Sequence, residues 1–223
     1  MLRTHQIATV GEDSETVLVG LRNIPAHRLD LICLPQNRES VDRFALNLER
    51  TLKIDVDVHT IKGSIVEGVL EKVASLLKEY ANEFDDVVLN VAGGDKTLTC
   101  AAVSAAFFNG VKAFHLMNEN PVLLPILKVN YNTVISRAKV KILQALHSAG
   151  GVTKSLGELS DLSGYGKPLL SYHVWGDNES RGLVELGLVE AVRKQRGRLR
   201  VTLTTLGKAM ILGQSDSGEE NQM

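Results

Sequence analysis

The chain has 223 residues, of which 44% are hydrophobic, and a formal net charge of -1 at pH 7. This length fits one large domain or two modest ones, and the hydrophobic content excludes a chain that is disordered throughout. No secretory signal opens the sequence and no apolar run reaches the length of a membrane span, so we expect a cytoplasmic protein without membrane contact. Cys33 and Cys100 lie in apolar runs, which predicts buried thiols in a reducing compartment.

The first half of the chain alternates between short β-branched segments and amphipathic segments with helical spacing. Strands are predicted at 5–11, 28–35, 54–61, 86–92, 111–117 and 122–127, and helices at 14–24, 38–53, 64–84 and 96–109. The period-two pattern of 54–61 predicts an edge strand, and the continuous apolar run of 86–92 predicts a strand in the covered middle of the sheet. Residues 1–127 are therefore predicted to form a Rossmann-like α/β domain with a parallel sheet.

The segment LNVAGGDKT, at 89–97, joins the fourth predicted strand to the helix that follows it. Gly93 and Gly94 allow a close approach of backbone to a ligand, the helix start offers free N–H groups, and Lys96 and Thr97 add a charge and a hydroxyl. These features suit a phosphate. The alternative is a tight β–α turn with a solvated lysine, because the spacing matches neither a Walker motif nor a dinucleotide fingerprint. A second candidate loop, 10–16, follows the first strand, and both loops should lie at the carboxyl edge of the sheet.

The second half differs from the first half in charge. Residues 1–127 hold 12 Lys+Arg and 17 Asp+Glu, whereas residues 128–213 hold 13 and 6, and the tail at 214–223 adds three acids. Helices are predicted at 132–151, 155–166 and 167–190, followed by strand, basic turn, strand and helix over 191–212. This order predicts an α+β winged helix-turn-helix domain over 128–213, and the tail is predicted to be disordered.

A basic winged helix-turn-helix favours double-stranded DNA as the partner. The third helix would enter the major groove and the wing arginines would contact the backbone. The predicted DNA-binding residues are Lys154, Lys167, Ser171, Tyr172, His173, Arg193, Lys194, Arg196, Arg198 and Arg200. A protein-binding winged helix, or a charged hairpin that is merely solvated, is the alternative. Trp175, the only tryptophan, is expected in the core.

LNVAGGDKT resembles the strand-four signature of CARF (CRISPR-associated Rossmann fold) domains, an apolar strand followed by Asn-x-Thr-Gly-Gly-Thr-Lys. The chain keeps Asn90, Gly93, Gly94 and Lys96 of that pattern. It has Ala92 and Asp95 where threonines are usual, and a carboxylate beside a phosphate is repulsive unless it contacts a ribose hydroxyl or an adenine amino group. A CARF domain followed by a winged helix is similar to the archaeal CRISPR-associated transcriptional regulators.

This resemblance implies a homodimer that senses a cyclic oligoadenylate, most often the tetra-adenylate, and regulates transcription in antiviral defence. The implied ligand-binding residues are Gly11, Glu12, Asp13, Ser14, Ala92, Gly93, Gly94, Asp95, Lys96 and Thr97. Two alternatives stay open, a ring nuclease that cleaves its cyclic ligand and a regulator that senses an unrelated small anion. We expect no catalytic residues, no cofactor other than the regulatory ligand and no metal, because the six histidines have no paired spacing.

Overall fold

The computed structural model describes residues 2–126, 135–177, 180–194 and 198–212. The chain divides into two compact units, Met1–Val129 and Asn130–Met223, and each is described by itself. Within the described ranges, no helix has both the length and the apolar character needed to cross a membrane. Arg196, Lys128 and the acidic tail at 214–223 lie outside the described residues.

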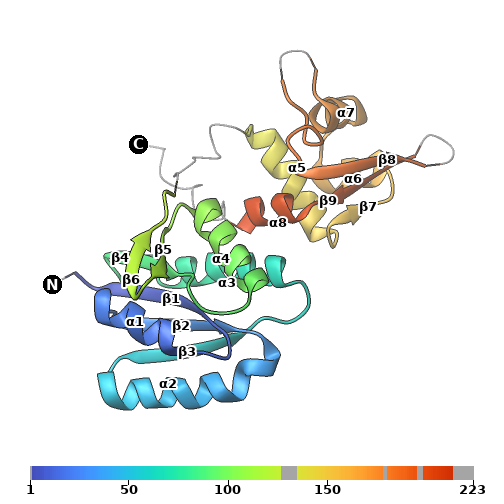
Figure 1. Cartoon of the computed structure of the whole chain (residues 1–223). Helices are drawn as coiled ribbons and strands as arrows, with labels where there is room; N and C mark the ends of the chain where they lie inside the picture. Colours follow the sequence, from blue (N-terminus) through green and yellow to red (C-terminus); the bar gives the residue numbers. More distant parts are fainter. Residues whose placement is uncertain (1, 127–134, 178–179, 195–197, 213–223) are drawn as a thin grey trace. The chain divides into compact units, whose positions relative to one another are not determined.

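The first unit alternates strands and helices (Figure 1). Its strands are β1 (Thr4–Val10), β2 (Arg28–Cys33), β3 (Asp55–Thr60), β4 (Asp86–Asn90), β5 (Lys112–Met117) and β6 (Asn120–Leu123). Its helices are α1 (Glu15–Asn23), the short 3-10 helix η1 (Pro35–Asn37), α2 (Arg38–Leu52), α3 (Ile65–Glu79) and α4 (Lys96–Asn109). Most bounds lie within a few residues of the predicted ones, and α4 coincides with its prediction.

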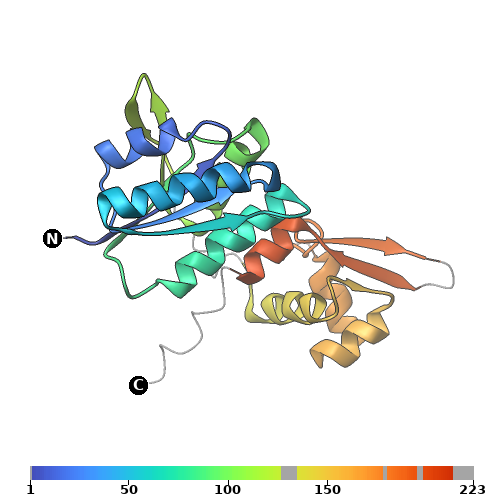
Figure 2. The same cartoon turned by 90° about the horizontal axis from the view of Figure 1, so that it is seen from below.

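The sheet has the order β3-β2-β1-β4-β5-β6, with the first five strands parallel and β6 antiparallel to β5. This confirms an α/β domain with a mostly parallel sheet, with β3 at an edge and β4 in the interior as predicted. Helices α1 and α2 pack on one face, and α3 and α4 lie on the other face against each other (Figures 1 and 2). The strand order reverses direction between β1 and β4, which makes their carboxyl ends the topological switch point.

Small residues explain the close packing of α4. Its buried positions are mostly alanines, so the helix axis can lie near both the sheet and α3. The helix ends where Gly110 takes a left-handed conformation with φ 62°, which a glycine adopts without strain.

A buried charge cluster lies on the face of the sheet opposite α1 and α2, and its side chains come from β1, β2 and β3. Asp30 is fully buried, and its carboxylate accepts hydrogen bonds from His5 Nε2 at 2.6 Å, His59 Nε2 at 2.5 Å and Arg28 Nε at 3.0 Å. The Arg28 guanidinium also contacts Asp57 and lies 4.2 Å from the centre of the Tyr80 ring. His5 and His59 are far apart in the sequence, but both reach Asp30 because β1 and β3 lie on either side of β2.

Burial alone would raise the pKa of Asp30. The hydrogen bonds from His5 and His59 and the charge of Arg28 outweigh burial and hold that pKa well below the usual range for an aspartate. The carboxylate is therefore ionised in the folded protein at any physiological pH, and its three donors fix the relative positions of three neighbouring strands.

The second unit contains α5 (Arg137–Ser148), β7 (Val152–Thr153), α6 (Leu156–Ser163), α7 (Lys167–Trp175), β8 (Val189–Arg193), β9 (Leu199–Leu203) and α8 (Thr205–Leu212). Its three strands form an antiparallel sheet of order β7-β9-β8. The buried side chains Leu143, Leu146, Leu159, Leu170 and Val201 come from four of these elements, α5, α6, α7 and β9, and form its core.

Three sequence-based expectations are wrong. The helix predicted over 167–190 ends at Trp175, because Gly176 has φ 78° and a side chain there would collide with the backbone of 180–182. Trp175 is 41% exposed and does not belong to the core. Cys100 is exposed, whereas Cys33 is buried as predicted.

Replacing Asp30 with asparagine should destabilise the first unit by about 3 kcal/mol or more, because the partly buried Arg28 and the two histidines lose the negative charge and one of the two acceptor oxygens that they share. Since the pKa of Asp30 is lowered on folding, its stabilising effect is present in full above about pH 5 and is lost as the pH falls below about 4. Urea unfolding between pH 3 and pH 7 should therefore show a shallower acid limb for Asp30→Asn. In the control Asp57→Asn the altered side chain is 57% exposed. Its loss should be under about 1 kcal/mol. An unchanged acid limb in Asp30→Asn would contradict this account.

Candidate functional site at the carboxyl ends of β1 and β4

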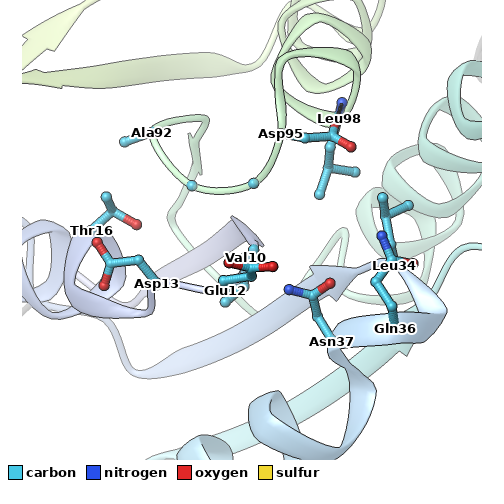
Figure 3. A pocket seen from close by; sticks show the side chains of 13 residues that line it. Val10, Glu12, Asp13, Thr16, Leu34, Gln36, Asn37, Ala92, Asp95 and Leu98 are labelled. Carbon is cyan, nitrogen blue, oxygen red and sulfur yellow. Dashed lines mark hydrogen bonds between the residues drawn. The ribbon is translucent and has the colours of Figure 1, made fainter.

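A cavity of about 440 Å³ opens at the switch point between β1 and β4 (Figure 3). Three connections surround it: the one between β1 and α1, the one between β2 and α2, and the one between β4 and α4. The lining residues are Val10, Gly11, Glu12, Asp13, Thr16, Leu34, Gln36, Asn37, Ala92, Gly93, Gly94, Asp95 and Leu98. Two loops about 80 residues apart in sequence therefore form one site.

Glycines allow these two loops to touch backbone to backbone. A Cβ atom on Gly11 would lie 2.9 Å from Gly94 Cα, and a Cβ atom on Gly93 would collide with the carbonyl oxygen of Thr9. Gly94 has φ 93°, in the region that favours glycine, and a Cβ atom there would lie 2.7 Å from Leu98 Cδ2. The pair of glycines therefore has a structural role in the turn as well as forming the cavity wall.

Two buried polar side chains hold the loops in place. The Thr9 hydroxyl donates to the carbonyl oxygen of Gly93 at 2.6 Å. Asn90 is fully buried: its Nδ2 donates to the carbonyl oxygen of Thr16 at 3.2 Å, and its Oδ1 accepts from the backbone N–H of Ala92 at 3.1 Å. Asn90 therefore connects the start of α1 to the loop after β4, which gives a physical role to the asparagine of the signature.

Two of the acidic side chains accept hydrogen bonds from backbone N–H groups at helix starts, and one of them, Asp95, is the N-cap residue of its helix. The Asp95 carboxylate accepts from the backbone N–H of Leu98 at 2.8 Å at the start of α4. The Asp13 carboxylate accepts from the N–H of Glu15 at 2.8 Å at the start of α1, whereas the side chain of Ser14 makes no capping hydrogen bond. Aspartate and threonine are both good N-caps, so Asp95 keeps the capping role of a threonine while adding a negative charge next to the helix N-terminus.

The cavity lining is acidic. It contains the carboxylates of Glu12, Asp13 and Asp95, the amides of Gln36 and Asn37, and no lysine or arginine. The hydroxyl oxygen of Thr16 is buried without a hydrogen-bond partner in the described structure. This lining suits the hydrogen-bond donors of a ligand, such as hydroxyl and amino groups, better than its phosphates.

Seven of the ten predicted ligand-binding residues line the cavity: Gly11, Glu12, Asp13, Ala92, Gly93, Gly94 and Asp95. Ser14, Lys96 and Thr97 lie next to lining residues in sequence but are not part of the wall, and Lys96 and Thr97 are exposed. The sequence analysis missed three lining residues of the β2–α2 connection, Leu34, Gln36 and Asn37. Because β2 is the parallel neighbour of β1, this connection starts at the same carboxyl edge of the sheet as the loop after β1.

In the second unit, most of the predicted DNA-binding residues are exposed. Lys154 follows β7, Lys167 and Tyr172 are exposed on α7, and Ser171 is partly exposed. The hairpin of β8 and β9 carries exposed cations: Arg193, Lys194, Arg198 and Arg200.

His173 requires a correction. Its side chain is only 8% exposed, so it does not belong to the outer face of α7. Burial, together with the charge of Lys139, lowers the pKa of His173 below its usual range, and the ring is therefore neutral near pH 7. A neutral, buried histidine supplies no positive charge to a phosphate, so we remove His173 from the DNA-contacting set.

Lys139 is itself buried on α5. Its ammonium donates to Ser180 Oγ at 3.1 Å and to the carbonyl oxygen of Arg181 at 2.5 Å. Across the parts of the chain that the structure describes, no group of three or more His, Cys, Asp and Glu side chains is placed to hold a metal ion.

The model of the family described as "HFX_2341_N:-like, N-terminal" matches residues 3–121, which is more than half of the chain. The chain belongs to this family. The match covers β1 to β5 and α1 to α4, so all the residues that line the cavity lie within the matched region. No curated protein matches the sequence.

Several solved structures are similar to the chain. Can2 from Sulfobacillus thermosulfidooxidans, in complex with cyclic tetra-adenylate, is 13% identical, with 94% of this chain and 61% of its own covered, at a TM-score of 0.44. A type III CRISPR defence DNA nuclease activated by cyclic oligoadenylate is 14% identical, with 78% and 34% covered, at 0.47. Enterococcus italicus Csm6, bound to cyclic hexa-2'-fluoro-hexa-dAMP, is 8% identical, with 73% and 50% covered, at 0.43. The matches thus span between 34% and 61% of the lengths of these structures.

Replacing Asn90 with aspartate should destabilise the HFX_2341_N-like domain by about 3 kcal/mol or more, because the new oxygen meets the Thr16 carbonyl and brings an unpaired charge into the interior. Urea unfolding at pH 7 measures this effect. The matched control is Asn120→Asp, at an exposed position in the β5–β6 hairpin. Its effect should be within about 0.5 kcal/mol. Equal losses in the two variants would show that the Asn90 bridge does not hold the loops.

Proposed function

We propose that the protein is a dimeric, ligand-responsive DNA-binding transcription regulator of a CRISPR system, and that its first unit senses a cyclic oligoadenylate. The observation that carries this proposal is the shared cavity: the two loops predicted to bind the ligand lie at the switch point and line one site. The signature residues around it support the same function, since Asn90 positions the loop and the glycines form the wall.

The chemistry of the cavity suggests how the ligand lies. A ribose hydroxyl or an adenine amino group can donate to Glu12 or Asp95, and the amides of Gln36 and Asn37 can donate or accept. The phosphates would instead lie at the rim, near the first N–H groups of α4 and the exposed ammonium of Lys96. A cavity of about 440 Å³ holds part of a ring of four nucleotides, which is why we propose that two copies of the chain share one ring.

The second unit supports a winged helix as the DNA-binding module. Its order of helices and strands, α5-β7-α6-α7-β8-β9, is that of a helix-turn-helix followed by a hairpin wing. In this proposal α7 is the recognition helix, with Lys167 and Tyr172 on its exposed side, and Arg198 and Arg200 on the wing contact phosphates. Ligand binding would change the DNA affinity because the ligand binds the two DNA-binding arrangements of the dimer unequally.

Calorimetric titration with cyclic tetra-adenylate tests the ligand site. We expect one ring per two chains, and weaker binding by about tenfold in Lys96→Ala, because a hydrogen bond to a charged group is lost. Arg43→Ala removes an exposed cation on α2 that does not line the cavity, and this variant should bind like the wild type. The absence of binding by the wild type would overturn the proposal. Chromatography of the ligand after the titration identifies a linear product if the protein is a ring nuclease.

Gel-shift titration on the chain's own promoter DNA tests the DNA-binding role. The logarithm of the affinity should fall steeply with the logarithm of the salt concentration, and Arg198→Ala should lower that slope by about one unit because one phosphate contact is lost. Arg181→Ala is the control, since its side chain is 75% exposed outside the hairpin. A promoter affinity that does not depend on salt would argue against phosphate contacts by the hairpin.

A further inference from the structure

A second cavity, of about 530 Å³, lies at the carboxyl end of the edge strand β3. It is bounded by the start of α2, by the end of β3 with the loop that follows, and by the second turn of α3. Unlike the first cavity, its lining contains no acidic residue and three cations, namely Arg38, Lys62 and Lys72. His59 and Thr60 complete its polar wall.

Arg38 is held in a fixed position with hydrogen-bonding capacity to spare. Its Nε donates to Asp42 Oδ2 at 2.7 Å, and its Nη1 donates to the carbonyl oxygen of Val58 at 2.8 Å and to Thr60 Oγ1 at 3.2 Å. These bonds cover part of the open edge of β3. They leave Nη2 without a hydrogen-bond partner among the described residues.

The two lysines supply the charge that is not neutralised. Within the described parts of the chain, neither Lys62 nor Lys72 forms an ion pair, whereas the carboxylate of Asp42 is already engaged by Arg38. The site also lies at the N-terminus of the 15-residue helix α2, where the helix dipole favours negative charge. Positive charge thus converges on this cavity from a helix start, a loop and a neighbouring helix.

We propose that this cavity binds the phosphate group of a small anion or nucleotide, through Lys62, Lys72 and the free Nη2 of Arg38. A planar guanidinium with two ammonium groups matches the several oxygens of a phosphate. The inference is independent of the proposed oligoadenylate site, although the two cavities flank the same segment: Leu34, Gln36 and Asn37 line the first cavity, and Pro35 and Arg38 line the second.

Titration of the full chain with sodium pyrophosphate at low salt tests this site by calorimetry. The double variant Lys62→Gln/Lys72→Gln should weaken binding by at least about tenfold, because two hydrogen bonds to charged groups are lost. Lys62→Arg/Lys72→Arg keeps both charges and should bind within a few-fold of the wild type. Arg50→Gln removes one exposed cation from the other end of α2 and should have no effect. Thermal unfolding of each variant confirms that it is folded.

The outcomes separate this site from the first cavity. Lys96→Gln should retain the pyrophosphate binding that the double glutamine variant loses, because Lys96 does not line the second cavity. If Lys96→Gln abolishes binding while the double glutamine variant retains it, the anion lies at the start of α4 and the inference is overturned. It is likewise overturned if the wild type does not bind pyrophosphate or if Arg50→Gln loses as much affinity as the double variant. Adenosine 5'-diphosphate that binds more tightly than pyrophosphate, with the same loss in the double variant, would identify a nucleotide as the source of the phosphate.

Discussion

The close approach of two backbones at the carboxyl ends of β1 and β4 is the constraint on which the first cavity depends. Gly11 meets Gly94, and Gly93 lies against the carbonyl oxygen of Thr9, so no side chain fits at these contacts. The hydrogen bonds of Thr9 and Asn90 then fix the two loops relative to each other. The sequence left a choice between a tight turn and a ligand-binding turn. In the structure one arrangement serves as both, because the tight turn forms the cavity wall.

Charge divides the carboxyl edge of the sheet into two regions. The switch-point cavity is lined by three carboxylates, and two of these, Asp13 and Asp95, are anchored by hydrogen bonds from backbone N–H groups at the starts of the helices that follow. Their negative charge lies next to helix N-termini, which lowers the cost of keeping acids together. The cations of the same edge gather instead around β3, at Arg38, Lys62 and Lys72. A phosphorylated ligand would therefore meet hydrogen-bond acceptors in one region and positive charge in the other.

Local sequence patterns predicted most of the fold, and contacts between distant segments account for what they missed. The small-residue helix α4, the edge strand β3 and the interior strand β4 follow from local composition and apolar patterning, which each segment carries by itself. The meeting of His5 and His59 at Asp30 depends on strand order and register, which periodicity does not encode. The same holds for Gln36 and Asn37, which reach the cavity because β2 pairs with β1.

The second unit has two exposed surfaces of different chemistry, one on α7 and one on the β8–β9 hairpin. Because the helix stops at Gly176, its exposed side is short, with Lys167 at the start and Leu169, Tyr172 and Trp175 along its length. Arg193, Arg198 and Arg200, which are all exposed, belong to the hairpin instead. If the unit binds DNA, the hairpin supplies the salt-dependent attraction, and α7 supplies mainly apolar contacts, of the kind that recognise a thymine methyl group. A protein partner would instead bury Tyr172 and Trp175 and bind with little dependence on salt, since apolar burial is not screened. The salt dependence of binding therefore distinguishes the two kinds of partner more directly than the identity of any single residue.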